Sequence, residues 1–239
     1  MKAVIIAAGN SSRLWPKTNK TPKTLLPYQN GTILSTIMHN IADAGIDEFV
    51  FILGFKPEYI KKYLDENHSF GFQTDIIINP EFQRGNGLSV LLANKIITDQ
   101  PFILSMSDHV VTPSAIKRII KDPRDKNLLL IDKRINDIFD IDDATKVWTN
   151  SNRIEKINKN LTEYNGIDCG IFRLTPRFFG AMREQEKLGK ESISAGVEVL
   201  IQNNDMEACF MEPEETWIDI DTPDAYHYAL DKYSIKAIL

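Results

Sequence analysis

The first half of the chain alternates short apolar segments with segments of helical periodicity, and this alternation limits the folds open to it. Strand-length apolar segments occur at 2–8, 49–53, 74–78 and 102–106. Helical patterns separate them, at 33–42, 57–67 and 87–97. Strands that are apolar throughout and alternate with helices are typical of a parallel sheet covered on both faces. We therefore predict an α/β fold with a Rossmann-like mixed, mainly parallel sheet and helices on both faces.

The second half is less regular. Strands are expected at 146–149, 153–157, 166–174 and 208–211, with a hairpin turn at 150–152. Helices are expected at 176–187, at 193–203 and from Thr222 onward, where threonine is the N-cap and Pro223 the first helical residue. No linker or repeat separates the two halves. We predict a single domain over 1–239, with the half 126–239 packed against the half 1–125.

Charge and cysteine content exclude several classes of protein. The net charge of −5 argues against nucleic acid as the main partner, because binding to a phosphate backbone usually needs a basic face. The two cysteines, Cys169 and Cys209, are too few for a disulfide framework. The apolar run at 3–8 is too short for a membrane span or a signal peptide. We expect a cytoplasmic protein without membrane insertion, and the sequence leaves homo-oligomer formation open.

A loop of small residues after the first predicted strand is the first candidate site. It reads Ala7-Ala8-Gly9-Asn10-Ser11-Ser12-Arg13-Leu14 and is followed by Pro22-Lys23. Successive backbone N–H groups in such a loop bind phosphate oxygens, and Arg13 and Lys23 add a forked and a movable cation. The loop matches neither GxxxxGK[ST] nor GxGxxG. An ordinary turn with solvated cations is the alternative.

Carboxylates occupy positions that suit a divalent metal. Asp108 follows the strand at 102–106, and Asp219 and Asp221 alternate within a short extended segment after Trp217. Mg²⁺ prefers oxygen ligands and commonly uses one or two carboxylates together with substrate phosphates. For Asp108 a solvated strand end or a charge at a helix N-terminus is the alternative.

A glycine-rich turn precedes the helical pattern at 87–97. It contains Gly85, Asn86, Gly87 and Ser89. Glycines let the backbone approach a flat ligand such as a nucleotide base. A plain connection between strand and helix is the alternative.

With these motifs the chain resembles the sugar-phosphate nucleotidyltransferases, whose opening motif is a small residue, Gly-x-Gly/Ser-[ST]-Arg and a later Pro-Lys. The resemblance implies the nucleotide-diphospho-sugar transferase fold and an Mg²⁺-dependent transfer of a nucleotidyl group from an NTP to a phosphorylated sugar or polyol, with release of pyrophosphate. It implies that 1–125 binds nucleotide and 126–239 the acceptor. The implied catalytic residues are Arg13, Lys23 and Asp108, and the implied metal ligands are Asp108 and Asp219. The implied nucleotide contacts are Ala7, Ala8, Gly9, Asn10, Ser11, Ser12, Gly85, Asn86, Gly87 and Ser89.

Several stretches favour the branch of this family that uses CTP and inositol-1-phosphate. They are the loop at 85–89 and the segments 106–109, 143–146, 153–161, 168–170 and 217–222. The resemblance implies that Lys159 contacts the acceptor phosphate, and that Thr145, Lys146 and Asp168 are acceptor contacts. It also implies a separate membrane phosphotransferase that consumes the product.

The chain departs from the family pattern at two places. Ser11 replaces a glycine of the first loop, which predicts a stiffer phosphate loop. Asn158 and Asn160 replace the glutamate and proline that flank the family's lysine, here Lys159.

His109 and Trp217 are given non-catalytic roles, and several other functions fit the same motifs. His109 is interpreted as a wall or orienting group, because a phosphate needs no strong base to ionise, and Trp217 as a packing residue. A uridylyl- or thymidylyltransferase for a hexose-1-phosphate and a choline-phosphate cytidylyltransferase keep the same chemistry. A non-catalytic nucleotide-sensing subunit and a metal-dependent glycosyltransferase are alternatives of other classes.

Overall fold

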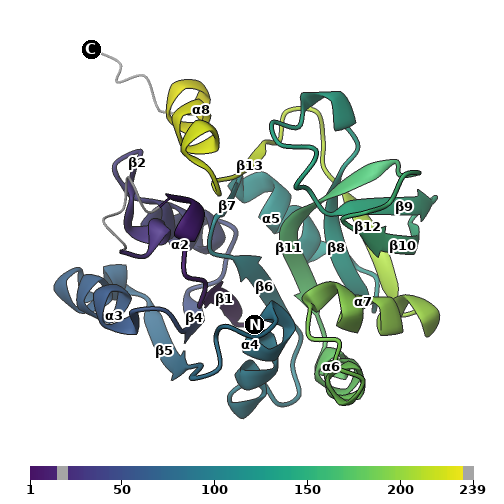
Figure 1. Ribbon diagram of the computed structural model, residues 1–239, viewed down its shortest axis with the longest axis horizontal. Coiled ribbons are helices and arrows are strands. Elements are labelled where there is room, and N and C mark those ends of the chain that lie inside the picture. The colour runs from purple at the N-terminus through teal and green to yellow at the C-terminus, as the bar shows by residue number, and fades with distance from the viewer. Residues whose placement is uncertain (15–20, 234–239) are drawn as a thin grey trace.

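A mixed β-sheet passes through both halves of the chain (Figure 1). The structure is a computed structural model that describes residues 1–14 and 21–233. Within these residues the main sheet has nine strands. In sheet order they are β5 (Gln73–Ile78), β4 (Glu48–Leu53), β1 (Ala3–Ala7), β6 (Phe102–Met106), β11 (Gly166–Leu174), β8 (Asn127–Asp132), β12 (Met206–Phe210), β10 (Arg153–Asn158) and β9 (Lys146–Asn150).

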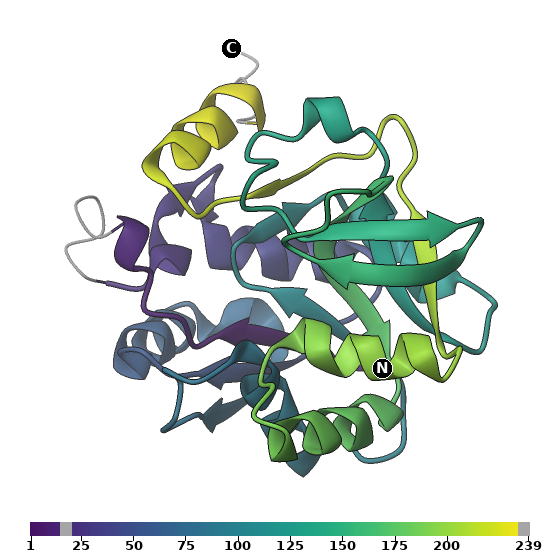
Figure 2. The same cartoon turned by 45° about the vertical axis from the view of Figure 1, so that its right-hand side comes forward.

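Strand direction changes at β11. The strands β5, β4, β1 and β6 are mutually parallel, as the apolar runs predicted. β11 runs antiparallel to both β6 and β8, whereas β12 is parallel to β8. The β9–β10 hairpin lies at the end of the sheet remote from β5 (Figure 2). The second half of the chain therefore continues the same sheet.

Helices cover both faces of the sheet. They are α2 (Ile33–Asp43), α3 (Pro57–Glu66), α4 (Asn86–Leu92), α5 (Pro113–Lys121), α6 (Arg177–Lys187), α7 (Ile193–Gln202) and α8 (Pro223–Tyr233). Short 3₁₀ turns occur at Ser12–Leu14, Lys23–Leu25, His68–Gly71, Ala93–Lys95 and Ile135–Asp137. This confirms the predicted mixed sheet with helices on both faces.

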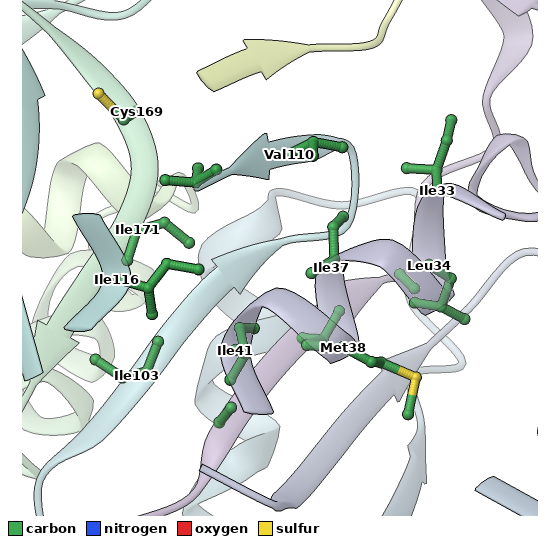
Figure 3. Close-up of a cluster of buried hydrophobic side chains, with 14 of the residues drawn as sticks. Ile33, Leu34, Ile37, Met38, Ile41, Ile103, Val110, Ile116, Cys169 and Ile171 are labelled. Carbon is green, nitrogen blue, oxygen red and sulfur yellow. The ribbon is translucent and has the colours of Figure 1, made fainter. Parts of the chain in front are cut away.

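Alternate residues of the central strand β1 face two hydrophobic layers. Ile5 packs with α2 and α5, whereas Val4 and Ile6 pack with α4, α6 and α7. In Figure 3 the apolar stripe of α2 lies against the sheet near Ile103 and Ile171. Thr32 caps α2 in a capping box with Ser35. The central strands β4, β1 and β8 are thus buried on both faces.

Several elements were not predicted. They are α5, the wholly buried β8, and the short pairs β7 (His109–Val111) with β13 (Trp217–Asp219) and β2 (Pro27–Tyr28) with β3 (Gly31–Thr32). The helix predicted at 87–97 ends as α4 at Leu92 and continues as a 3₁₀ turn. None of the helices within 1–14 and 21–233 has the length and apolarity that crossing a membrane requires.

Candidate active site

The short β7–β13 pair brings the two predicted metal ligands together. Asp219 in β13 lies opposite His109 in β7, and the backbone N–H of Ile220 donates to the carbonyl of Asp108 at 3.0 Å. Asp108 itself follows β6 directly. Two carboxylates that are distant in the sequence therefore meet at the carboxyl end of β6, where parallel sheets commonly bind ligands.

A cavity of about 470 Å³ opens beside this pair. It is lined by residues from the ends of β6 and β8, the loop 134–145, β11, β13 and α8. Among the predicted site residues, its lining includes Asn86, Asp108, Thr145, Lys159, Asp168 and Asp219. The predicted acceptor contacts and metal ligands thus share one cavity.

Arg13 and Lys23 join this site through carboxylates. The Lys23 Nζ lies 2.7 Å from Asp108 Oδ2 and also pairs with Asp221. Arg13 pairs with Asp221, and its Nη1 lies 2.9 Å from Asp143 Oδ2. The Lys159 Nζ lies 2.9 Å from the other oxygen of Asp143. The cations predicted to bind phosphate are thus paired with carboxylates that line the cavity.

The charges of the site shift the pKa of several groups. Burial is the largest influence on Asp108 and raises its pKa, but the Lys23 charge and the His109 hydrogen bond outweigh it and hold that pKa below its usual range. Burial lowers the pKa of His109, yet Asp219 and Asp108 raise it to about 9. Burial raises the pKa of Asp219. A new cation beside Asp219 would therefore favour its charged form.

The carboxylates fit a divalent metal ion. Asp108, His109 and Asp219 offer ligand atoms that lie within 4.8 Å of one another, and so do Asp143, Asp219 and Asp221. Asp219 Oδ1 is buried and has no hydrogen-bond partner among the described residues. A buried oxygen without a donor, beside further carboxylates, is an arrangement that a hard cation such as Mg²⁺ would satisfy.

The phosphate loop uses Ser11 as a structural link. Its φ of 57° lies in the left-handed region that favours the glycine of the family pattern. Its hydroxyl accepts a hydrogen bond from the backbone N–H of Lys23 at 3.1 Å, and Asn10 accepts one from the N–H of Ser12 at 3.2 Å. Ala7 and Ala8 are buried, and Gly9 is exposed. Phosphate contact by this loop stays a prediction.

The predicted base loop is packed against the α6–α7 connection. The N–H groups of Gly85 and Gly87 donate to the Glu191 carboxylate at 3.2 Å and to its carbonyl at 2.9 Å. A Cβ at position 85 would lie 2.3 Å from that carbonyl, so these glycines allow the loop to pack. Ser89 is buried and accepts a hydrogen bond from Asn79. Base contact by the loop stays a prediction, and of its four residues Asn86 is the one that lines the cavity.

The acceptor side combines contact residues with supporting ones. Lys146 is buried, and its Nζ donates to the carbonyls of Asp142, Ala144 and Lys159 at 3.0–3.3 Å. These bonds tie the 142–146 loop to the turn that carries Lys159. Asp168 accepts from the N–H of Gly170 at 2.7 Å, and burial raises its pKa to about 6. Lys146 thus has a structural position, while direct contact by Thr145, Lys159 and Asp168 stays a prediction.

Sequence reasoning missed two parts of the site. The sequence pointed to Asp143 only as part of the segment 143–146, although this carboxylate pairs with both Arg13 and Lys159. The sequence motifs give no role to Asp132 and Arg134, although Asp132 ends an apolar run, much as Asp108 follows one. Trp217 has packing contacts, as interpreted, and also donates to Asp132. An acidic residue at the end of an apolar, strand-length segment is the sequence signal that could have identified Asp132.

Comparison with known proteins places the chain among nucleotidyl transferases and their structures. Residues 2–137 match the sequence model of the nucleotidyl transferase family. A bifunctional IPC transferase and DIPP synthase of Aquifex aeolicus is 30% identical over 242 residues, which cover 99% of this chain and 52% of that relative. A protein of the same name from Thermococcus kodakarensis is 32% identical, with 93% of this chain and 48% of the relative covered. The chain spans about half the length of these curated relatives.

Solved structures share the fold over nearly the whole chain. The inositol-1-phosphate CTP transferase from T. maritima superposes with a TM-score of 0.85 at 24% identity, covering 97% of this chain and 95% of that one. A UDP-glucose pyrophosphorylase complexed with UDP-glucose superposes with a TM-score of 0.81 at 16% identity, covering 97% of both chains. The predicted nucleotide-diphospho-sugar transferase fold is confirmed.

Proposed function

The chain belongs to the nucleotidyl transferase family, and from this premise we propose that it transfers a cytidylyl group from CTP to inositol-1-phosphate and releases pyrophosphate. The names of the relatives support this choice, because a structure of the same fold is called an inositol-1-phosphate CTP transferase and the curated relatives are called IPC transferases. The product is consumed by a downstream membrane phosphotransferase, and the enzyme acts in the cytoplasm.

One observation carries the proposal. The cations Arg13, Lys23 and Lys159 converge on carboxylates at the edge of a single cavity. A nucleotide triphosphate and a phosphorylated acceptor both need cations. The carboxylates of Asp143 and Asp168 can accept hydrogen bonds from the hydroxyls of a polyol. The same arrangement would serve an acceptor that is phosphorylated and rich in hydroxyl groups.

The residues act by positioning and charge neutralisation. A phosphate oxygen of the acceptor attacks the α-phosphorus of CTP in line, and the bond to the pyrophosphate oxygen breaks. No nucleophile of the protein is needed, because orientation and electrostatic stabilisation supply most of the catalysis of such transfers. Arg13 and Lys23 exchange their carboxylate partners for phosphate oxygens, and Lys159 binds the acceptor phosphate. Mg²⁺ held by Asp108 and Asp219 would neutralise charge on the phosphate oxygens when bound.

Pyrophosphate release from the purified protein tests the proposal. CTP, UTP, dTTP, ATP and GTP are each combined with Mg²⁺ and with inositol-1-phosphate, glucose-1-phosphate, mannose-1-phosphate, glycerol-3-phosphate or phosphocholine. Release with CTP and inositol-1-phosphate supports it. Release with another pair moves the substrate and keeps the chemistry. Nucleotide binding without release from any pair would favour the sensing subunit and reject catalysis.

A further inference from the structure

We propose that Asp132 and Trp217 are positioning residues, which hold the predicted metal ligands Asp108 and Asp219 in place through the ring of His109. The inference rests on the proposed function, since it assumes that a divalent cation binds these two carboxylates. The sequence motifs assign no role to Asp132, and they indicate only a packing role for Trp217.

The Trp217 indole contacts the His109 imidazole. Their rings are stacked, with centroids 5.7 Å apart and planes at 14°. In the antiparallel pair, His109 lies opposite Asp219, so Trp217 is its diagonal neighbour on the same face. The indole Nε1 donates to Asp132 Oδ2 at 3.1 Å. The indole is therefore held at one edge by a hydrogen bond while its face supports the imidazole.

His109 lies between the carboxylates of Asp108 and Asp219. Its Nδ1 lies 2.7 Å from Asp108 Oδ1 and 3.8 Å from Asp219 Oδ1. Gly170 closes another side of the ring, because a Cβ there would lie 2.5 Å from His109 Cδ2. Trp217, Gly170 and Asp108 thus leave the imidazole little freedom to turn. A fixed ring therefore anchors Asp108 through a hydrogen bond and limits how closely Asp219 Oδ1 can approach it.

Asp132 is anchored at the end of β8. Its carboxylate is buried and accepts hydrogen bonds from the backbone N–H, Nε and Nη2 of Arg134 at 2.8–2.9 Å, in addition to the indole. Arg134 also donates to the carbonyls of Pro213 and Glu215, both at 2.8 Å. Asp132 and Arg134 therefore hold both the Trp217 side chain and the backbone that leads into β13.

Partners of this kind commonly matter to metal sites. Residues that orient the ligands of a metal typically change metal affinity or activity by about 10–100-fold when they are replaced. The competing interpretation is that Asp132 binds the acceptor directly, because it also lines the cavity. Its acceptor positions are already used by Arg134 and Trp217, which favours positioning. The two interpretations predict different measurements.

The experiment compares Trp217→Phe and Asp132→Asn with wild type and with the control Trp148→Phe. Phenylalanine keeps a ring against His109 and removes the indole N–H, and asparagine keeps the shape of Asp132 and removes its charge. Trp148 lies in β9 and is not among the residues lining the cavity. Binding is measured by water-proton relaxation with Mn²⁺ and CTP in the absence of acceptor. Pyrophosphate release is measured against Mg²⁺ concentration, and thermal unfolding confirms that each variant is folded.

We expect about tenfold weaker Mn²⁺ binding in Trp217→Phe and Asp132→Asn, with no change in Trp148→Phe. The Mg²⁺ concentration for half-maximal release should rise by a similar factor, and saturating Mg²⁺ should restore most of the turnover. Unchanged Mn²⁺ affinity in both folded variants would overturn the inference. A higher KM for the acceptor with unchanged Mn²⁺ affinity would overturn it too, in favour of direct acceptor binding. If wild type itself neither holds Mn²⁺ nor releases pyrophosphate, the proposed function has failed instead.

Discussion

Carboxylates near β13 occur in two settings that differ in their partners. Asp143 and Asp221 stand at the cavity edge, where they pair with Arg13, Lys23 and Lys159. The side chains of Arg13 and Lys159 are 51% and 55% exposed, so water and ligands reach their pairs with Asp143, whereas Lys23 is 9% exposed. Asp132 ends β8 and also lines the cavity, but its side chain is only 5% exposed, and its donors are a backbone N–H, a guanidinium and an indole. The first setting can exchange partners, and the second cannot.

The difference separates binding from architecture. An exposed carboxylate can orient a mobile cation. Its loss should change stability little, because an exposed ion pair contributes only about 0–1 kcal/mol. Truncating a buried carboxylate with filled acceptor positions destabilises the fold, because its former donors are left buried without partners. Replacements in the first setting should therefore change kinetics, and replacements in the second should change stability as well.

The largest effect is expected from Asp108→Asn. Losing this charge removes a predicted metal ligand and the partner of Lys23, so we expect pyrophosphate release to fall by about 10²–10³-fold, as for loss of one strong electrostatic contact in a transition state. Far-ultraviolet circular dichroism should be unchanged. Asp224→Asn, in the exposed first turn of α8, is the control and should retain full turnover. Near wild-type release by Asp108→Asn at saturating Mg²⁺ would reject the metal assignment.

Asp132→Ala tests stability in the second setting. Removing one partner of a buried pair typically costs about 3–5 kcal/mol. The Arg134 side chain is 31% exposed, so water offsets part of the loss, and we expect the free energy of unfolding to fall by about 2–4 kcal/mol.

Asp143→Ala is the matched variant in the first setting and should lower the free energy of unfolding by about 1 kcal/mol or less. Urea unfolding of both proteins measures the difference. Equal losses in the two variants would remove the distinction between the settings.

Lys159→Ala should affect binding of the acceptor and leave the fold intact. A hydrogen bond to a charged group is worth about 1.5–3 kcal/mol, so we expect KM for inositol-1-phosphate to rise about tenfold or more, with KM for CTP unchanged. Lys156→Ala is the control, because Lys156 is an exposed lysine on β10, the strand that precedes Lys159, and does not line the cavity. Equal changes in both KM values would contradict a specific role at the acceptor phosphate.

A pH-dependent effect is expected from Asp168, a carboxyl that lines the cavity. Burial raises its pKa to about 6, against about 3.9 in an unfolded chain. The folded state therefore binds the proton more tightly, so this contribution to stability is complete below pH 4 and is lost as the pH rises through 6. Relative to Asp168→Asn, wild type should gain about 2 kcal/mol of unfolding free energy between pH 7 and pH 4. Urea unfolding in EDTA at both values measures it, and a constant difference would contradict the raised pKa.

Local patterns predicted much of the fold. The apolar runs of β1, β4 and β6 are strong signals because both faces of a central parallel strand are buried. The capping threonine and proline also marked the start of α8 correctly. By contrast, β8 is an apolar run between charged residues, and the position of β11 between β6 and β8 depends on pairing that no local pattern specifies.

The site was predicted in its residue types and less well in its geometry. Arg13, Lys23, Asp108 and Asp219 were expected to act together, and the structure gathers them. The three-residue strands that bring Asp219 to Asp108 are too short for a periodic signal. The role of Asp132 depends on a contact with Trp217, which lies 85 residues further along the chain. Such contacts follow from tertiary packing alone.

The place of β11 in the sheet has a consequence for how the chain folds. The strand that completes hydrogen bonding along β6 ends at Leu174, whereas the family match ends at residue 137. A nascent chain or a fragment that stops at 137 would present the apolar β6 as an open edge, and open edges recruit strands from other molecules. We therefore expect such a fragment to aggregate, and folding during synthesis to wait until β11 has left the ribosome.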